Sequence, residues 1–143
     1  MSRITLGKTC WKVSDQTLGF SFGGGTLICK SGGVGWIVAP SSTEVSRDWF
    51  NLDDSVTTAE ANAACGDWFV PTGPQFQNPG HCCQIYWDAS PACDHFWTST
   101  ELSATSARCI LFYPGAFPQF DGALTSGPKT NSAKIRAFRC VTY

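Results

Sequence analysis

The sequence predicts an α+β fold, in which one or two short helices and long loops flank a small antiparallel sheet. Three observations indicate this class. Apolar runs around a glycine turn predict a hairpin at Thr26–Ala39, and a second strand-rich block covers His95–Gly115 and returns at Lys134–Tyr143. Helix-start signals lie together between these two blocks. In a parallel sheet they would alternate with the strands.

The hairpin is predicted from the runs Thr26–Lys30 and Gly35–Ala39, which are separated by Ser-Gly-Gly-Val. Glycine reaches the positive φ values that a tight turn requires, and Pro40 ends the second strand. Residues 1–22 precede the hairpin, and in this segment apolar and polar residues alternate only in part. We therefore divide the chain into an N-terminal strand or assembly arm, 1–22, and a compact domain, 23–143.

Two helix starts are predicted where a threonine is followed three residues later by Glu or Gln, the pattern of a capping box. Thr57 opens the first, which predicts a helix over the alanine-rich segment Thr58–Cys65. Thr72 opens the second, which predicts a shorter helix that ends before Pro79.

Three strands are predicted to lie side by side as an antiparallel core. Phe96–Glu101 is rich in threonine and aromatic residues, and Arg108–Tyr113 is an almost continuous apolar run. Ile135–Val141 is apolar towards its end except for Arg139, as expected of a strand that enters the interior.

Composition restricts the possible partners. Charged residues make up 15% of the chain, against roughly 25% in an average soluble domain, while aromatic residues make up 13%. This bias favours a surface that is partly covered by other proteins. A net charge of −1 with scattered signs argues against nucleic acid. No apolar run approaches the ~18 residues of a membrane span, and no signal peptide is evident, so we expect no membrane partner.

The cysteine content is high for this length and has two interpretations. In a reducing cytosol the thiols would stay buried and reduced, whereas a protein that works outside the cell, as in a virus particle, could oxidise after release. The eight residues are Cys10, Cys29, Cys65, Cys82, Cys83, Cys93, Cys109 and Cys140.

Four motifs in a fixed order resemble a family of small bacterial and phage domains with the C-type lectin-like fold. They are the glycine-rich strand and Ala-Pro step in Gly23–Ser42, the Trp-x-x-Pro-Thr helix start in Gly66–Phe76, the Trp-x-Ser-Thr-Glu strand in His95–Gly115, and the Arg-x-x-Arg strand in Lys134–Tyr143. The family includes the C-terminal domain of a Legionella collagen-like adhesin and the Fibrobacter major paralogous domain. The resemblance covers about Gly23–Tyr143 and implies a C-type lectin-like fold.

The resemblance also suggests pairings. In this fold a disulfide commonly ties the first helix to the last strand, and Cys65 and Cys140 hold those places. Glu101 belongs to the family's strand motif, which implies an ion pair with Arg136 or Arg139 that holds adjacent strands in register. Two further disulfides are predicted, and they are Cys10 with Cys29 and Cys93 with either Cys82 or Cys83.

No metal, cofactor or catalytic site is predicted. His81, Cys82, Cys83, Cys93 and His95 supply soft ligands within one loop, but they lack the Cys-x-x-Cys spacing of zinc sites. The Glu-Pro-Asn or Gln-Pro-Asp loop and the Trp-Asn-Asp strand of calcium-dependent sugar binding are also missing. A cysteine that lies close to either histidine in the sequence is not thereby placed in the geometry of a catalytic dyad.

The resemblance implies a phage context, because short free-standing copies of this domain are common among phage virion genes. We expect a non-catalytic virion structural protein, made in the host cytoplasm and placed in a capsid as cement or decoration, or in a tail or fibre. Its partners would be other virion proteins or further copies of itself. The alternative is a carbohydrate- or receptor-binding module for a host surface glycan, with Trp87, Trp97, Phe117 or Phe120 stacking on the sugar.

Overall fold

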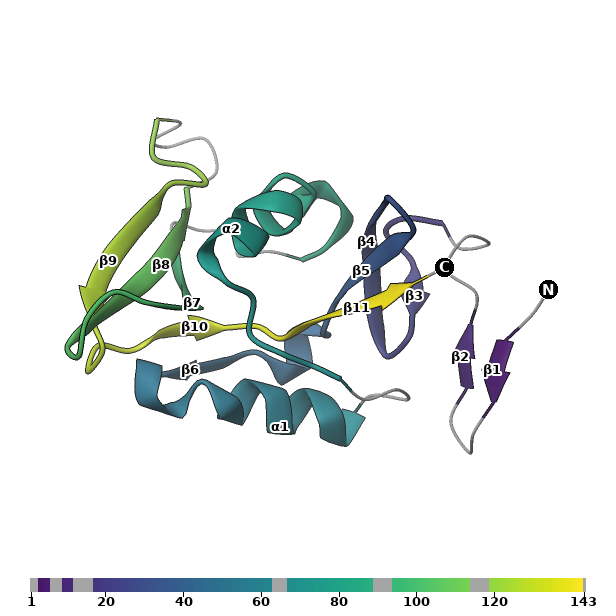
Figure 1. Cartoon of the computed structure of the whole chain (residues 1–143), viewed down its shortest axis with the longest axis horizontal. Helices are drawn as coiled ribbons and strands as arrows, with labels where there is room; N and C mark the ends of the chain where they lie inside the picture. The colour runs from purple at the N-terminus through teal and green to yellow at the C-terminus, as the bar shows by residue number, and fades with distance from the viewer. Residues whose placement is uncertain are drawn as a thin grey trace.

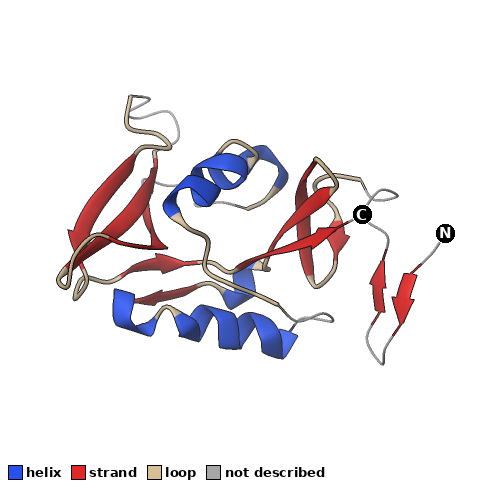
Figure 2. Cartoon of the chain, in the orientation of Figure 1, coloured by secondary structure: helices blue, strands red, loops and turns tan. Residues whose placement is uncertain are grey.

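The computed structural model describes residues 3–5, 9–11, 17–62, 67–88, 94–113 and 119–142, with the backbone alone at 3–5, 9–11 and 62. Strands dominate this part of the chain and form a five-stranded sheet, a four-stranded sheet and a separate two-stranded hairpin. Figure 2 shows the helices between and beside the two larger sheets. The predicted α+β class is confirmed at this level.

The four-stranded sheet has the order β11-β5-β4-β3 and contains the predicted hairpin. β4 pairs antiparallel with β5 through a turn at Gly32 and Gly33, whose φ angles of 57° and 81° only glycine adopts readily. This hairpin is confirmed. The strands are β3 (Ser21–Phe22), β4 (Gly25–Ser31), β5 (Val34–Val38) and β11 (Phe138–Thr142).

The five-stranded sheet has the order β6-β10-β7-β8-β9. β7 and β8 pair antiparallel, as predicted, with Trp97 opposite Cys109. β9 forms an edge strand although its Ser, Gly and Pro residues are poor strand formers. An edge position tolerates Pro128, because one side of an edge strand has no ladder partner. The strands are β6 (Val45–Arg47), β7 (Asp94–Glu101), β8 (Ser106–Phe112), β9 (Leu124–Pro128) and β10 (Ala133–Ile135).

The predicted three-stranded antiparallel core is wrong at its third strand. Ile135–Val141 is not one strand beside β7 and β8, because it divides at Arg136 and Ala137. β10 pairs with β7 in the parallel direction, whereas β11 pairs antiparallel with β5 in the other sheet. Figure 1 shows the two strands, in yellow, running in succession from one sheet to the other. The C-terminal segment therefore connects the sheets.

The first helix also differs from its prediction. α1 (Asp53–Asn62) begins several residues earlier, so Thr57 lies inside the helix and cannot cap it. The 3-10 helix Trp49–Asn51 leads directly into α1, and Asp53 and Asp54 occupy the first turn, where negative charge is favoured. Tertiary contacts of this lead-in segment override the local capping signal.

The predicted capping box of the second helix is confirmed. Thr72 accepts a hydrogen bond at Oγ1 from the backbone N–H of Gln75 (3.3 Å), and the Gln75 side chain accepts one from the backbone N–H of Thr72 (3.0 Å). α2 (Gly73–Gln75) is followed by the helical segment Phe76–His81, which breaks at Asn78 (φ −144°, ψ 111°) and then regains a turn. The prediction that the helix ends before Pro79 is therefore only partly correct.

The N-terminal segment contains three short strands. β1 (Arg3–Thr5) and β2 (Thr9–Trp11) pair antiparallel with each other, and β3 extends the four-stranded sheet at its edge. The division of the chain at residue 22 stays a prediction. The remaining 3-10 helices are Ser41–Thr43 and Gln84–Tyr86.

An aromatic core joins the two large sheets. Phe76 is fully buried, and the ring centroids of four neighbours lie 5.1–6.3 Å from its own. These neighbours come from both sheets and from the loop after the helical segment, and they are Trp87, Phe96, Phe112 and Phe138. In Figure 1 the α2 segment lies between the two sheets.

Candidate functional site

The centre of the candidate site is Arg136, which lies between β10 and β11 and is 1% exposed. Its Nε and Nη2 atoms both donate to Oε1 of Glu44, at 3.2 and 2.9 Å. Nη1 donates to the Asp88 carboxylate (3.1 Å) and to the backbone oxygen of Ala39 (3.0 Å). Nη2 also donates to the backbone oxygen of Asp88 (3.3 Å). The guanidinium is thus fully partnered, which offsets the cost of burying its charge.

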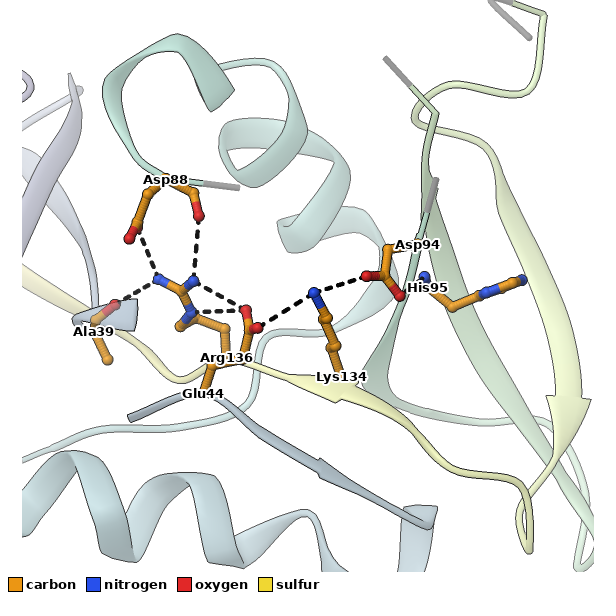
Figure 3. Close-up of polar contacts among 7 residues, drawn as sticks. All are labelled: Ala39, Glu44, Asp88, Asp94, His95, Lys134 and Arg136. Atoms are coloured by element: carbon orange, nitrogen blue, oxygen red, sulfur yellow. Dashed lines mark hydrogen bonds and ion pairs between the residues drawn. The ribbon is translucent and has the colours of Figure 1, made fainter. Parts of the chain in front are cut away.

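The ion pairs continue from Arg136 towards the five-stranded sheet (Figure 3). Lys134 Nζ lies 3.6 Å from the second oxygen of Glu44 and 2.7 Å from Asp94 Oδ2. The hydrogen bond to Asp94, with the nearby charge of Glu44, raises the pKa of Lys134. We call Asp88, Arg136, Glu44, Lys134 and Asp94 the Arg136 network. It joins β7, β10 and the loops around Asp88 and Glu44.

Beside this network lies an open groove of about 480 Å³, which we call the Tyr86 groove. Its polar floor is linked to the network, because Asp88 lines the groove and binds Arg136. Its rim carries the apolar side chain of Ile85, which is 81% exposed. The lining residues are Gly19, Thr26, Pro40, Ser41, Ile85, Tyr86, Trp87 and Asp88.

A second, smaller hollow of about 270 Å³ lies at the five-stranded sheet, and we call it the Trp97 hollow. Trp97, Cys109 and Thr125 are register partners on three adjacent strands, so they form one row across its base. Gly127 lies close to the indole, because a Cβ there would approach the ring of Trp97 to 3.3 Å. The other lining residues are His95, Ser126, Pro128, Asn131, Ser132 and Ala133.

Of the aromatic residues predicted to bind sugar, two are buried in the structure. Trp87 and Trp97 are 7% and 1% exposed, and each indole N–H donates to a backbone oxygen, of Gly80 and Arg47 respectively. The prediction of free stacking platforms is therefore wrong for these two, because both belong to the core and only line the hollows. Phe120 is 48% exposed, and Phe117 lies outside the described residues.

The predicted ion pair of Glu101 with Arg136 or Arg139 is also wrong. Glu101 forms an ion pair with Lys129, whose side chain is 2% exposed and lies over the ring of Trp49 at 4.4 Å. Arg139 donates to the backbone oxygen of Gly23 (2.9 Å), and burial lowers its pKa. The partner of Glu101 comes from the turn after β9, which no sequence motif singled out.

The cysteine predictions can be compared only in part. Cys29, Cys82, Cys83, Cys109 and Cys140 carry free thiols in the structure. The predicted pairs involve three further cysteines, of which Cys65 and Cys93 lie outside the described residues and Cys10 is described by its backbone alone. Those disulfides stay predictions.

Comparison with known proteins gives no match: no family model matches the chain, and no curated protein is significantly similar to it in sequence. Within the described ranges, no three His, Cys, Asp or Glu side chains are grouped so as to hold a metal ion. The same part of the chain has no helix with the length and apolarity needed to span a membrane. The site is therefore interpreted from its geometry alone.

Acid is expected to weaken the Arg136 network at Asp88. Partial burial alone would raise the pKa of this carboxyl, but hydrogen bonds from Arg136 and Ser41 outweigh burial and hold its pKa below the ordinary value. Its contribution to stability is therefore present above the unfolded-state pKa of about 3.9 and is lost as the pH falls through the lower folded-state value. Urea unfolding between about pH 5 and pH 2 should show a smaller loss of stability in Asp88→Asn than in the wild type. An equal loss in both proteins would contradict this assignment.

Proposed function

We propose that this chain is a non-catalytic structural subunit of a phage virion, either a capsid cement or decoration protein or a tail or fibre component. It is made in the host cytoplasm and binds neighbouring virion subunits or further copies of itself. The four sequence motifs support the phage context and a C-type lectin-like fold. The geometry supports an assembly role rather than a reaction.

The observation that carries the assembly role is the exposed apolar side chain of Ile85 at the rim of the Tyr86 groove. Ile85 is the most exposed large apolar side chain among the described residues, at 81%. Exposed apolar groups beside a concave surface are typical of protein contact sites, where a few buried anchors supply most of the binding energy. A partner subunit that covers Ile85 would remove this apolar side chain from water.

The surrounding structure makes the groove suitable for docking. Asp88 is held by Arg136, and Trp87 packs against the aromatic core, so the groove wall rests on buried and fully partnered groups. A rigid surface loses little conformational entropy on binding, which favours a stable contact. The Arg136 network thus has a structural role beneath the groove.

Substitution of the rim tests this proposal. Ile85→Asp should lower the number of copies in purified particles at least about tenfold, because a buried anchor would be replaced by a charge. Phe50→Asp is the matched control, since Phe50 is 61% exposed and does not line the groove. Quantitative mass spectrometry of the particles gives the copy number. Equal incorporation of wild type and Ile85→Asp would contradict a docking role for the groove.

The copy number itself separates the two function classes. A structural subunit should be present at a number set by capsid or tail symmetry. A few copies per particle, located at a fibre tip, would instead favour receptor binding.

A second candidate function is carbohydrate binding, and the Trp97 hollow favours it. Hydroxyl and amide groups of Thr125, Ser126 and Asn131 line this hollow beside an aromatic ring, a combination that suits a polyhydroxylated ligand. A glycan array run with a chelator should then show binding by the wild type and loss of binding by Asn131→Leu. If no glycan binds, carbohydrate binding is contradicted and the assembly role remains as the proposed function.

A further inference from the structure

Two cysteines from distant parts of the sequence lie on or next to elements that line the Tyr86 groove. Cys29 lies on β4, and Cys83 immediately precedes the 3-10 helix Gln84–Tyr86. β4 packs against that helix, and both side chains are half-buried against the same aromatic core cluster. The Cys29 side chain is a neighbour of the Cys83 thiol and contributes to the rise in its pKa. Neighbouring Cys82 is exposed.

We propose that Cys29 and Cys83 are a disulfide-forming pair, reduced in the cytosol and oxidised once the protein reaches an oxidising medium. This pairing differs from those suggested by the sequence, in which Cys29 is paired with Cys10, and Cys93 with either Cys82 or Cys83. A disulfide requires two cysteines whose backbones lie close together, and the packing of β4 against the 3-10 helix Gln84–Tyr86, with both side chains on one core cluster, brings these two cysteines together.

The oxidation needs an acceptor of two electrons, and a small-molecule disulfide such as oxidised glutathione supplies it. One protein thiolate attacks a glutathione sulfur, and the first reduced glutathione leaves. The second protein thiol, as its thiolate, then attacks the mixed disulfide, and the second reduced glutathione leaves. One sulfur–sulfur bond forms in the protein as one breaks in the oxidant, and the two protons end on the two glutathione thiols.

The surroundings of Cys83 favour the reduced state inside the cell. Burial, together with the neighbouring thiols of Cys29 and Cys82, raises the pKa of Cys83 to about 11. Because the thiolate is the reactive form, little of Cys83 can react near neutral pH. Oxidation should therefore be slow at pH 7 and faster at pH 9, in proportion to the thiolate fraction.

The disulfide would act on the groove wall. Cys83 lies two residues before Ile85, so a bond to Cys29 would tie the segment Gln84–Tyr86 to the four-stranded sheet. This regulatory step rests on the proposed docking function. It would fix the groove before a partner binds and so reduce the entropy lost on binding.

Peptide mapping of the intact chain tests the disulfide itself. The folded protein is incubated with oxidised glutathione at pH 8.5, alkylated and digested without reduction. We expect a peptide that links Cys29 to Cys83 and a rise in the unfolding temperature of roughly 5–10 °C. Cys83→Ser should lose both effects, whereas the matched variant Cys82→Ser should keep them. Recovery of Cys29 and Cys83 as free thiols, or of either in another disulfide, would overturn the proposal.

A binding measurement tests the effect on the groove separately. Oxidised wild type should bind to particles lacking this subunit at least about threefold more tightly than Cys83→Ser. If the mapped disulfide forms but the two affinities are equal, the disulfide stands and its regulatory role is overturned. If Ile85→Asp also leaves binding unchanged, the docking function fails, and peptide mapping still decides the disulfide.

Discussion

Arg136→Met should lower the free energy of unfolding by about 3–5 kcal/mol, because it removes the buried cation that pairs with Glu44 and Asp88 and leaves the largely buried Glu44 carboxylate undercompensated. Methionine occupies a similar volume, so the change reports on charge and hydrogen bonding more than on packing. Glu44 would keep only Lys134 as a cationic partner, at 3.6 Å. Urea denaturation, with the slope compared between proteins, measures the change.

The control for this prediction is an exposed ion pair of the same type. Arg47 and Asp54 lie 3.1 Å apart, with side chains 48% and 50% exposed, and Arg47→Met should cost about 0–1 kcal/mol. A double variant that also carries Glu44→Gln should recover part of the loss, because the uncompensated buried charge is then absent. A loss below about 1 kcal/mol in Arg136→Met would show that the network contributes little to stability.

Phe76→Ala should cost about 3–5 kcal/mol, because it removes a fully buried ring and leaves a cavity between the two sheets. The ring contacts four other aromatic side chains, and these cannot close the space without moving strands of both sheets. Thermal or urea unfolding measures the loss. We also expect weaker near-ultraviolet circular dichroism, since several aromatic rings would lose their fixed surroundings.

Phe20→Ala is the matched comparison for the core substitution. Phe20 is 67% exposed, so its removal should change stability by less than about 0.5 kcal/mol. Comparable destabilisation by Phe20→Ala and Phe76→Ala would contradict the assignment of Phe76 to the central core.

The Arg136 network, the Tyr86 groove and the cysteine pair share one segment of the chain, the loop between His81 and Asp88. Its aromatic residue Trp87 packs in the core, Asp88 binds Arg136, and Ile85 projects from the rim. The buried contacts of this loop thus hold its exposed apolar side chain in place. This arrangement is the physical basis of the proposed docking surface.

Local features of the sequence were sufficient where neighbouring residues determine the structure. The β4–β5 hairpin followed from two adjacent glycines, the capping box followed from Thr72 and Gln75, and the β7–β8 pair followed from two strand-like runs close together in the chain. In each case the stabilising contacts lie within a few residues of the signal. The α+β class followed from the order of these elements.

Features that depend on distant contacts were decided by the tertiary structure alone. The closing segment divides at Arg136 because each half finds its partner in a different sheet, and Glu101 binds Lys129 rather than an arginine. The meeting of Cys29 with Cys83 and the buried ion pairs of Arg136 likewise join residues far apart in the sequence. The side-chain types in the sequence show which groups can pair. Which of them come into contact is determined by the packing of the two sheets against the aromatic core.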